Sequence, residues 1–277
     1  MQQKIKDTVK IVLSIENIDL LFRKRLDIPL SESRRLRRND KTHTRSVLLG
    51  KKIEITDPFW YCHSLKEIFL EDTYKFSSQT ERPVIIDCGA NIGLSIIYFK
   101  QLYPQSTIIA FEPDPVIFSK MQENINRFQC NNVILHNKAV WKEDTVLAFA
   151  QNGSLGGALD IIPSRNYKQE LLNKVNAIRL NDYLQEPVDL LKIDIEGAEY
   201  EVLEDCKDSL RNVQHLFVEY HSAPGKKQEL PALLQIMENA GFRIYIKEAW
   251  NNLPLPFLHA QYKPFWDLQL NIFGYRK

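Results

Sequence analysis

The stretch with the clearest capacity for binding chemistry is residues 87–93, which read DCGANIG. It follows an apolar run typical of a buried strand and leads into a run of apolar residues with helical spacing. Gly89 and Gly93 let the backbone turn sharply and approach a ligand closely, and the start of the following helix offers free N–H groups. Because ligands of open α/β sheets bind at the carboxyl ends of the strands, we expect a cofactor-binding loop that uses Asp87, Gly89, Asn91 and Gly93.

Two classes of ligand are possible for this loop. A dinucleotide site needs the pattern GxGxxG around a pyrophosphate, and here Asn91 follows Gly89 and Ala90 where the second glycine is required. The carboxylate of Asp87 would repel a pyrophosphate, whereas it suits a ligand that carries a cationic amine. S-adenosylmethionine carries both an amine and a sulfonium, so we expect it as the cofactor. A nicotinamide-dependent oxidoreductase on the same architecture is the alternative.

Glu112 stands at the tip of the next predicted strand. Neighbouring parallel strands end at the same edge of a sheet, so its carboxylate is expected beside the glycine loop, where it can accept hydrogen bonds from both hydroxyls of a ribose. Asp114 precedes Pro115, which fits a helix N-cap with proline at the first helical position. After the third predicted strand, Asn137 and Ala139 are expected to flank an adenine ring, although asparagine at a strand end is also typical of a turn.

The elements that must position these residues begin near residue 83, where short apolar runs start to alternate with segments of helical periodicity. The predicted strands cover residues 83–88, 106–112, 132–137, 188–195, 215–221, 241–250 and 268–276. The predicted helices cover residues 91–103, 115–128, 198–206 and 229–240. Strands joined by helices indicate an α/β fold with a mostly parallel sheet and helices on both faces. The last two strands have no helix between them, so one is expected to run antiparallel near the end of the sheet.

Residues 1–80 are predicted to form an N-terminal extension that packs on a main domain of residues 81–277. In the extension, the first 25 residues have helical periodicity, residues 46–57 resemble short strands, and residues 63–76 are predicted to form a helix. The basic stretch from residue 34 to residue 45 is typical of a solvated loop or helix face. Its alternative role is contact with a phosphate or another anionic group.

An insertion between residues 139 and 179 interrupts the alternation of strands and helices. It holds two short apolar runs, AVWK and TVLAFA, which are predicted to be strands, and then the loop QNGSLGGALD. Ser154, Gly156 and Gly157 of this loop are candidates for a flap that closes over the site, although a glycine-rich loop is more commonly a plain connection.

Three motifs taken together, DCGANIG, AFEPDP and LLKIDIEGAEYEVL, resemble the FkbM family of S-adenosylmethionine-dependent methyltransferases. They occur in the family's order, and the resemblance covers roughly residues 74–221. It implies a Rossmann-like class I methyltransferase fold and O-methylation of a hydroxyl group on a sugar, a glycan or another small molecule. One departure is the pair Asn181 and Asp182, where the family often has a sequence rich in leucine and aspartate.

Methyl transfer to a hydroxyl group requires a positioned acceptor and removal of a proton. The predicted fourth and fifth strands end in KIDIE and EYH, which bring Lys192, Asp194, Glu219 and His221 to the same edge. We expect Asp194 and His221 to orient and deprotonate the acceptor, with Lys192 and Glu219 in support. In the alternatives, Asp194, Glu219 and His221 bind a divalent metal, Lys192 and Asp194 form a structural ion pair, or His221 caps a loop. We favour a site without metal because no HxxH or HxD spacing is present.

The composition of the chain bears on nucleic-acid binding, on the state of the cysteines and on the location of the protein. The 277 residues include 36 Lys and Arg and 35 Asp and Glu, which give a formal net charge of +1, so general electrostatic binding of nucleic acid is not expected. The four cysteines, Cys62, Cys88, Cys130 and Cys206, have no ligand spacing and are typical of reduced thiols. We found no secretory signal or membrane span, so a cytoplasmic location is expected. A non-catalytic methyltransferase-like binding module is a further alternative, although Asp87, Glu112 and Asp194 are intact.

Overall fold

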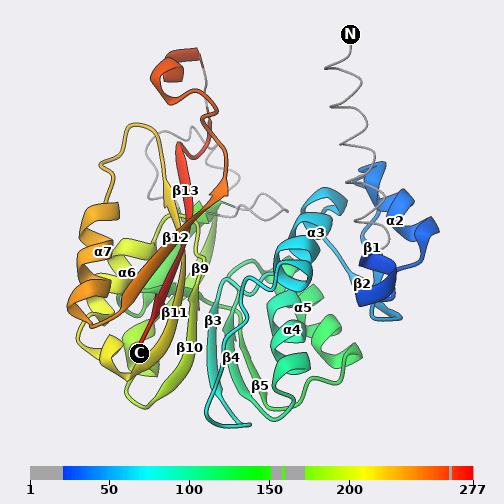
Figure 1. Ribbon diagram of the computed structural model, residues 1–277, viewed down its shortest axis with the longest axis horizontal. Helices are drawn as coiled ribbons and strands as arrows, with labels where there is room; N and C mark the ends of the chain where they lie inside the picture. The colour runs from blue at the N-terminus through cyan, green and yellow to red at the C-terminus, as the bar shows by residue number, and fades with distance from the viewer. Residues whose placement is uncertain (1–20, 151–157, 160–171, 262–263, 277) are drawn as a thin grey trace.

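The computed structural model describes residues 21–150, 158–159, 172–261 and 264–276 (Figure 1). Within these residues the strands form a seven-stranded sheet, a four-stranded sheet and a two-stranded hairpin. Of the helix predicted at the start of the chain, only residues 21–26 are described, and they are helical. The loop with Ser154, Gly156 and Gly157 lies outside the described residues. None of the described helices has the length and apolar character needed to cross a membrane.

The seven-stranded sheet has the order β12-β13-β11-β10-β3-β4-β5. It contains every strand predicted outside the insertion and the extension: β3 (Val84–Cys88), β4 (Thr107–Phe111), β5 (Val133–His136), β10 (Val188–Ile193), β11 (Val213–Ser222), β12 (Arg243–Trp250) and β13 (Leu268–Tyr275). Within this order, the neighbouring strands β11, β10, β3, β4 and β5 pair in parallel. β13 pairs antiparallel with both β11 and β12, so the predicted antiparallel strand is confirmed and lies second from the edge. The sheet is therefore the predicted Rossmann-like one.

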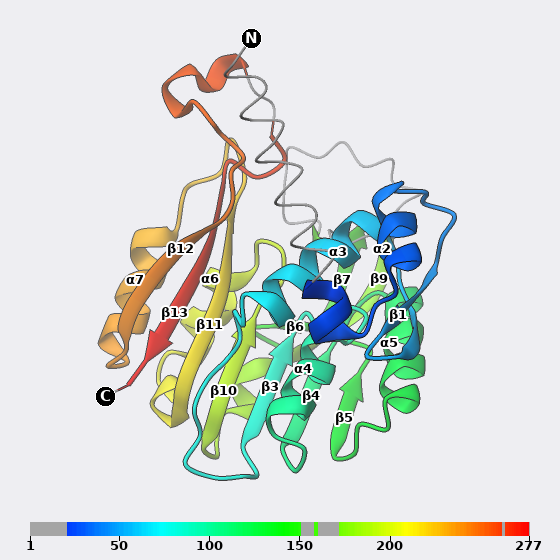
Figure 2. The ribbon, with the colours of Figure 1, turned by 45° about the vertical axis from the view of Figure 1, so that its right-hand side comes forward.

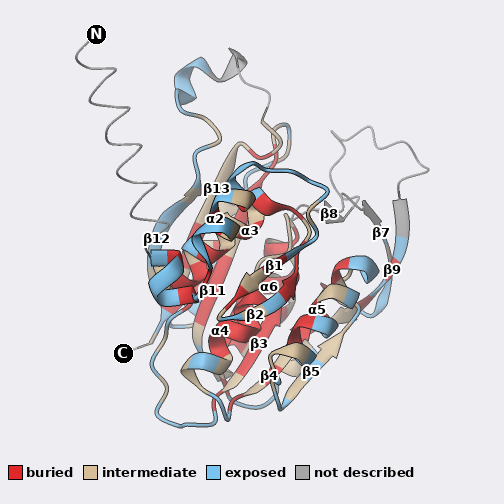
Figure 3. Ribbon diagram, turned by 90° about the vertical axis from the view of Figure 1, so that its right-hand side faces the viewer, coloured by how far each residue is buried: buried red, intermediate tan, exposed pale blue. Residues whose placement is uncertain are grey.

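Helices cover both faces of this sheet, as predicted (Figure 1, Figure 2). On one face lie α4 (Leu94–Leu102) and α5 (Pro115–Arg127), and on the other lie α6 (Glu199–Cys206) and α7 (Leu230–Asn239). Side chains alternate between the faces along each strand, so Ile85 belongs to the core under α4 and α5, and Ile86 to the core under α6 and α7. Buried positions concentrate in the central strands (Figure 3). Three short 3-10 helices are η3 (Leu180–Tyr183), η4 (Ser209–Asn212) and η5 (Pro256–Gln261).

The N-terminal extension shares its core with α4 and α5. It contains α2 (Leu30–Arg37), β1 (Arg45–Leu48), β2 (Lys51–Glu54), α3 (Pro58–Leu65) and the π-helix η1 (Lys66–Leu70). The helix predicted over residues 63–76 is wrong at both ends, because α3 begins at Pro58 and η1 ends at Leu70. The start signal that periodicity missed is Asp57, whose Oδ1 accepts the N–H of Phe59 at 2.8 Å, followed by proline at the first helical position. The basic stretch forms the end of α2 and a mostly exposed loop to β1, as predicted.

The insertion forms the four-stranded sheet, with the order β6-β9-β7-β8. The two predicted strands are β6 (Ala139–Trp141) and β7 (Thr145–Ala150). Two more, β8 (Ala158–Leu159) and β9 (Leu172–Arg179), were not predicted. β9 reads LNKVNAIR, in which Val175 and Ala177 are buried at strand spacing, but the alternation is short because the adjacent pairs Asn173-Lys174 and Ala177-Ile178 interrupt it.

One charged pair lies inside the seven-stranded sheet. Asp87 of β3 and Lys192 of β10 stand opposite each other in the parallel register, and both are buried. Lys192 Nζ lies 3.1 Å from Asp87 Oδ1, and Asp87 Oδ2 accepts a hydrogen bond from the hydroxyl of Ser95. Because an isolated buried charge is costly, each ion depends on the other.

Replacing Lys192 with methionine should therefore destabilise the fold by about 3–5 kcal/mol, since the buried carboxylate of Asp87 loses its counter-ion. The double variant with Lys192→Met and Asp87→Asn should recover part of this loss, because no charge then remains in the pair. Urea unfolding of the three proteins measures both effects. An unfolding free energy unchanged in Lys192→Met would contradict the dependence of Asp87 on Lys192.

Candidate active site

A cavity of about 480 Å³ opens at the carboxyl ends of the central parallel strands. The segments that directly follow β3, β4 and β10 contribute to its lining, together with Glu219 of β11. Residues of α3 and η1 from the extension also line it, as do Trp250 of β12 and the neighbouring pair Phe265 and Trp266. This is the edge at which open α/β sheets bind their ligands.

The glycine loop after β3 depends on backbone conformations that few residues tolerate. Gly89 has a φ of 82°, and a Cβ atom there would lie 1.9 Å from the carbonyl oxygen of Asp194. No residue with a side chain fits, so the loop and the end of β10 are in direct backbone contact. Asn91 also has a positive φ, of 49°, and its Oδ1 accepts the N–H of Ile92 at 2.7 Å. Gly89 and Asn91 line the cavity, whereas Gly93 precedes α4 outside the lining.

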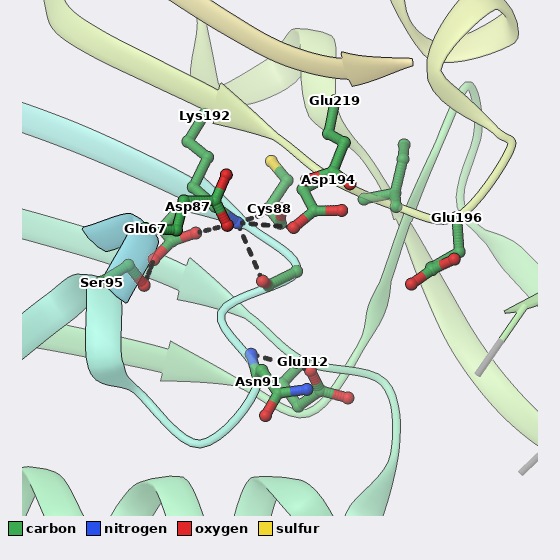
Figure 4. Close-up of polar contacts among 12 residues, drawn as sticks. Glu67, Asp87, Cys88, Asn91, Ser95, Glu112, Lys192, Asp194, Glu196 and Glu219 are labelled. Carbon is green, nitrogen blue, oxygen red and sulfur yellow. Dashed lines mark hydrogen bonds and ion pairs between the residues drawn. The ribbon is translucent and has the colours of Figure 1, made fainter. Parts of the chain in front are cut away.

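Glu112 directly follows β4 and lines the cavity beside this loop (Figure 4). Two backbone N–H groups orient its carboxylate: Oε2 accepts from Asn91 at 3.0 Å and Oε1 accepts from Asp114 at 2.9 Å. Burial raises the pKa of Glu112 to about 8. The expected N-cap is confirmed, since Asp114 Oδ1 accepts the N–H of Val116 at 2.8 Å.

The two residues expected to flank an adenine ring have different surroundings. Ala139, the first residue of β6, lines the cavity. Asn137 lies outside the lining, and its Nδ2 donates to the backbone oxygens of Glu112, at 2.8 Å, and Pro113, at 3.1 Å. These two hydrogen bonds hold the segment after β4 in place. Asn137 thus has the turn role that was the alternative to contact with an adenine ring.

Lys192 lines the cavity, and its ion-pair partner Asp87 lies next to it, outside the lining (Figure 4). The ammonium of Lys192 lines the cavity, donates to the carbonyl oxygen of Gly89 at 3.0 Å and lies 3.6 Å from Asp194 Oδ2. Despite its burial, the two carboxylates hold the pKa of Lys192 above its ordinary value. Asp87 is fully buried and outside the lining. The expected contact of Asp87 with an amine of the ligand does not agree with this arrangement, because the cation beside Asp87 is Lys192.

Several carboxyl groups face the cavity and repel one another when they are ionised. Asp194, Glu196 and Glu219 come from the ends of β10 and β11, and Glu67 comes from η1. Burial raises the pKa of Glu196 to about 8 and that of Glu67 to about 7, and repulsion by Asp194 and Glu219 adds to both shifts. Burial also raises the pKa of Glu219. Such a cavity favours a cationic ligand.

His221 lies behind these carboxylates rather than in the cavity lining. Its side chain is 1 % exposed, with Nδ1 at 3.0 Å from Glu199 Oε1 and Nε2 at 3.5 Å from Glu219 Oε1. Burial lowers the pKa of the imidazole, but the surrounding carboxylates outweigh burial and raise its pKa well above the ordinary value. A general base at His221 is therefore disfavoured, because a protonated imidazole has no lone pair for the proton of an acceptor.

The ligand atoms of Asp194, Glu219 and His221 lie within 4.8 Å of one another. The structure thus brings together the three residues of the metal alternative, with Glu199 behind the imidazole as such sites often have. A divalent cation would have to displace the proton that the carboxylates stabilise on His221. Metal binding at this point stays a prediction.

Sequence reasoning missed an aromatic part of the lining. Phe59, Trp60 and His63 of α3 contact Trp250 of β12, with ring centroids 6.3, 5.6 and 5.2 Å from that of Trp250. Glu67 lies four residues beyond His63, one turn along the same helical segment. The signal that could have located this wall is the run DPFWYCH, which combines a helix start with aromatic side chains.

Comparison with known proteins identifies the family. The chain matches the Methyltransferase FkbM domain over residues 87–244. It is 29 % identical over 235 residues to Methyltransferase 1 of Beauveria bassiana, which covers 73 % of this chain and 92 % of that protein. It is 31 % identical over 215 residues to Methyltransferase sdnD of Sordaria araneosa, which covers 65 % of this chain and 81 % of that protein.

A third relative is the 2-O-methyltransferase NoeI of Sinorhizobium fredii, with 26 % identity over 174 residues, which cover 56 % of this chain and 71 % of that protein. The domain match spans more than half of the chain and includes the glycine loop, Glu112 and the residues that end β10 and β11. The oxidoreductase alternative therefore falls away, and the chain belongs to the FkbM family of methyltransferases.

Proposed function

We propose that this methyltransferase transfers the methyl group of S-adenosylmethionine to a hydroxyl group of a sugar, a glycan or another small molecule. The observation that carries this proposal is Glu112, whose carboxylate lines the cavity beside the glycine loop and is oriented by two backbone N–H groups. A carboxylate held in this way is suited to accept hydrogen bonds from two adjacent hydroxyls of a ribose. Oxygen as the accepting atom is supported by the name of the relative from Sinorhizobium fredii, a 2-O-methyltransferase.

The residues of the cavity fit this cofactor. Glu112 and Ala139 suit its adenosine part, and the backbone turn from Gly89 to Asn91 suits the chain between ribose and sulfur. Asp194, Glu196 and Glu219 offer negative charge to the amine and the sulfonium. When bound, S-adenosylmethionine supplies an electrophilic methyl group. Asp87 and Gly93 contribute indirectly, through Lys192 and through the start of α4.

The protein's part in the reaction is to hold the acceptor in line and to remove its proton. We assign the orientation of the acceptor hydroxyl to Asp194, whose Oδ2 lies 3.6 Å from the ammonium of Lys192. Glu219 supports this group, and the imidazolium of His221 balances the charge of Glu219 and Glu196. If the metal alternative holds instead, a chelator abolishes turnover and added divalent metal restores it.

Incubation of the purified protein with labelled S-adenosylmethionine and a metabolite or glycan extract tests the proposed function. We expect label in a product whose methyl group is an ether, identified by mass spectrometry and fragmentation. Absence of S-adenosylmethionine binding in calorimetry, or label on nitrogen or carbon only, would contradict the proposal.

Cofactor affinity should depend on Glu112. Two charge-assisted hydrogen bonds to a ribose are together worth roughly 2–3 kcal/mol, so Glu112→Ala should weaken S-adenosylmethionine by tens-fold in calorimetry. Glu123→Ala, which removes an exposed carboxylate from α5, is the matched control and should leave the affinity unchanged. Equal affinity of wild type and a folded Glu112→Ala protein would remove Glu112 from the cofactor site.

The pKa of Glu112 near 8 predicts a pH-dependent affinity for the adenosine part alone. If only the ionised carboxylate accepts both hydroxyls, raising the pH from about 7 to about 9 increases the ionised fraction and thus the affinity by about ten-fold. Fluorescence or calorimetric titration with 5′-methylthioadenosine, which lacks the amino acid part, measures this effect. Glu112→Gln should remove the pH dependence, and a constant affinity of the wild type across this range would show that Glu112 does not titrate at the site.

A further inference from the structure

We propose that Glu67, supplied by the N-terminal extension, is the general base that takes the proton from the acceptor hydroxyl. The inference rests on the proposed O-methylation and assigns the group that the reaction requires once His221 is disfavoured as the base.

Glu67 enters the cavity from the N-terminal extension and not from the sheet. Glu67 belongs to η1, which follows α3, and lines the cavity together with Asp194 and Glu219 (Figure 4). It therefore approaches the other carboxylates from the extension, whereas they come from strand ends of the sheet. η1 is a π-helix, a rare conformation that occurs frequently at functional sites.

The contacts of Glu67 distinguish it from the other carboxylates of the cavity. Asn271 Nδ2 of β13 donates to Glu67 Oε1 at 3.0 Å, and Asn271 is itself buried. Within the described part of the chain, this is the only hydrogen bond of the Glu67 side chain, which makes no ion pair there. By contrast, Asp194 lies 3.6 Å from Lys192 Nζ, and Glu219 lies 3.5 Å from His221 Nε2.

Glu196 has a cationic neighbour as well, since its Oε2 lies 3.7 Å from His221 Nε2. A cation beside a carboxylate stabilises the ionised form and makes it a weaker base. Glu67 has instead a neutral amide on one oxygen. Among the carboxylates that face the floor of the cavity, it is thus the one best suited to accept a proton.

The electrostatic surroundings agree with this role. The groups that act on Glu67 are Glu219 of β11, Asp194 after β10, Asn271 of β13 and Glu71 at the end of η1. Burial comes first, and with the repulsion from the three carboxylates it outweighs the amide and raises the pKa of Glu67 to about 7. A general base works best with a pKa near the operating pH. A sulfonium bound in the cavity would lower this pKa and ionise the group before the reaction.

The aromatic wall indicates where the acceptor lies. Phe59, Trp60 and His63 precede Glu67 on the same helical segment and line the same cavity, with Trp250 across from them. Aromatic faces cover the apolar face of a ring, so an acceptor that packs on the cavity side of these rings would lie near Glu67, one turn along the same helical segment.

The acceptor oxygen forms a bond to the methyl carbon while the carbon–sulfur bond breaks, and the electron pair of that bond stays on sulfur. The hydroxyl proton passes to a carboxylate oxygen of Glu67 and from there to water. The products are a methyl ether and S-adenosylhomocysteine.

The first test needs no acceptor. Carbon-13 NMR of protein labelled at the glutamate side-chain carboxyl follows the titration of Glu67, whose signal is identified by its loss in Glu67→Gln. We expect the pKa of Glu67 near 7 in the free protein. It should be lower with saturating S-adenosylmethionine than with S-adenosylhomocysteine, which lacks the sulfonium charge. Titration near 4, or equal pKa values with the two ligands, would overturn the proposal.

The second test measures turnover with the acceptor that the labelled extract yields. Glu67→Gln keeps the hydrogen bond to Asn271 and should lower kcat by roughly 10²–10⁴-fold, with S-adenosylmethionine affinity nearly unchanged. Glu123→Gln is the matched control, because it changes an exposed carboxylate of α5 that lies outside the cavity lining, and it should keep the wild-type rate. The wild-type rate should rise with pH through the pKa of Glu67, because only the ionised carboxylate accepts a proton.

The two proposals fail in different ways. If the wild type transfers no methyl group to oxygen, the proposed function fails, and the NMR titration still decides whether Glu67 titrates near 7. If the wild type is active and Glu67→Gln keeps its full rate, only the assignment of Glu67 fails.

Discussion

The buried ion pair between Asp87 and Lys192 is the interaction on which the site depends. It joins the two central strands at the point where both reach the cavity, and the same ammonium holds the carbonyl of Gly89 and faces Asp194. A parallel sheet covered on both faces leaves no water for such charges. The pair therefore holds the glycine loop and the end of β10 in a fixed relative position. The direct backbone contact at Gly89 joins the same two segments.

Above this pair, the cavity collects more carboxylates than cations. Glu67, Asp194, Glu196 and Glu219 line it, while the cations near them are Lys192 and the imidazole of His221. Desolvation and mutual repulsion raise several of their pKa values. A positively charged cofactor would relieve this repulsion. The same electrostatic field that binds it would also set the protonation of the groups that face the acceptor.

The parts of the fold with strong periodicity could be predicted from the sequence. The runs that form β3 and β10 are apolar, bounded and separated by helices, and the positions of Gly89 and Glu112 follow from the topology of the sheet. The predicted contact of Asp87 with the ligand's amine was made without knowing which residue stands opposite Asp87 in the register, and that residue is Lys192. Glu67 was missed for the same reason, since its place in the cavity depends on how the extension packs and not on its own neighbours in the chain.

The direct contact between Gly89 and Asp194 leaves the glycine-loop side of the cavity little freedom to change, whereas the aromatic wall comes from α3 of the extension and from Trp250 of β12. The cavity thus has one wall that a backbone contact fixes and one wall that side chains build. Substitution of the cavity-lining Phe59, Trp60 or Trp250 can alter the shape offered to an acceptor without disturbing the sheet beneath. This division makes the scaffold evolvable: new acceptor preferences can arise by drift in one wall while the chemistry of methyl donation is inherited unchanged.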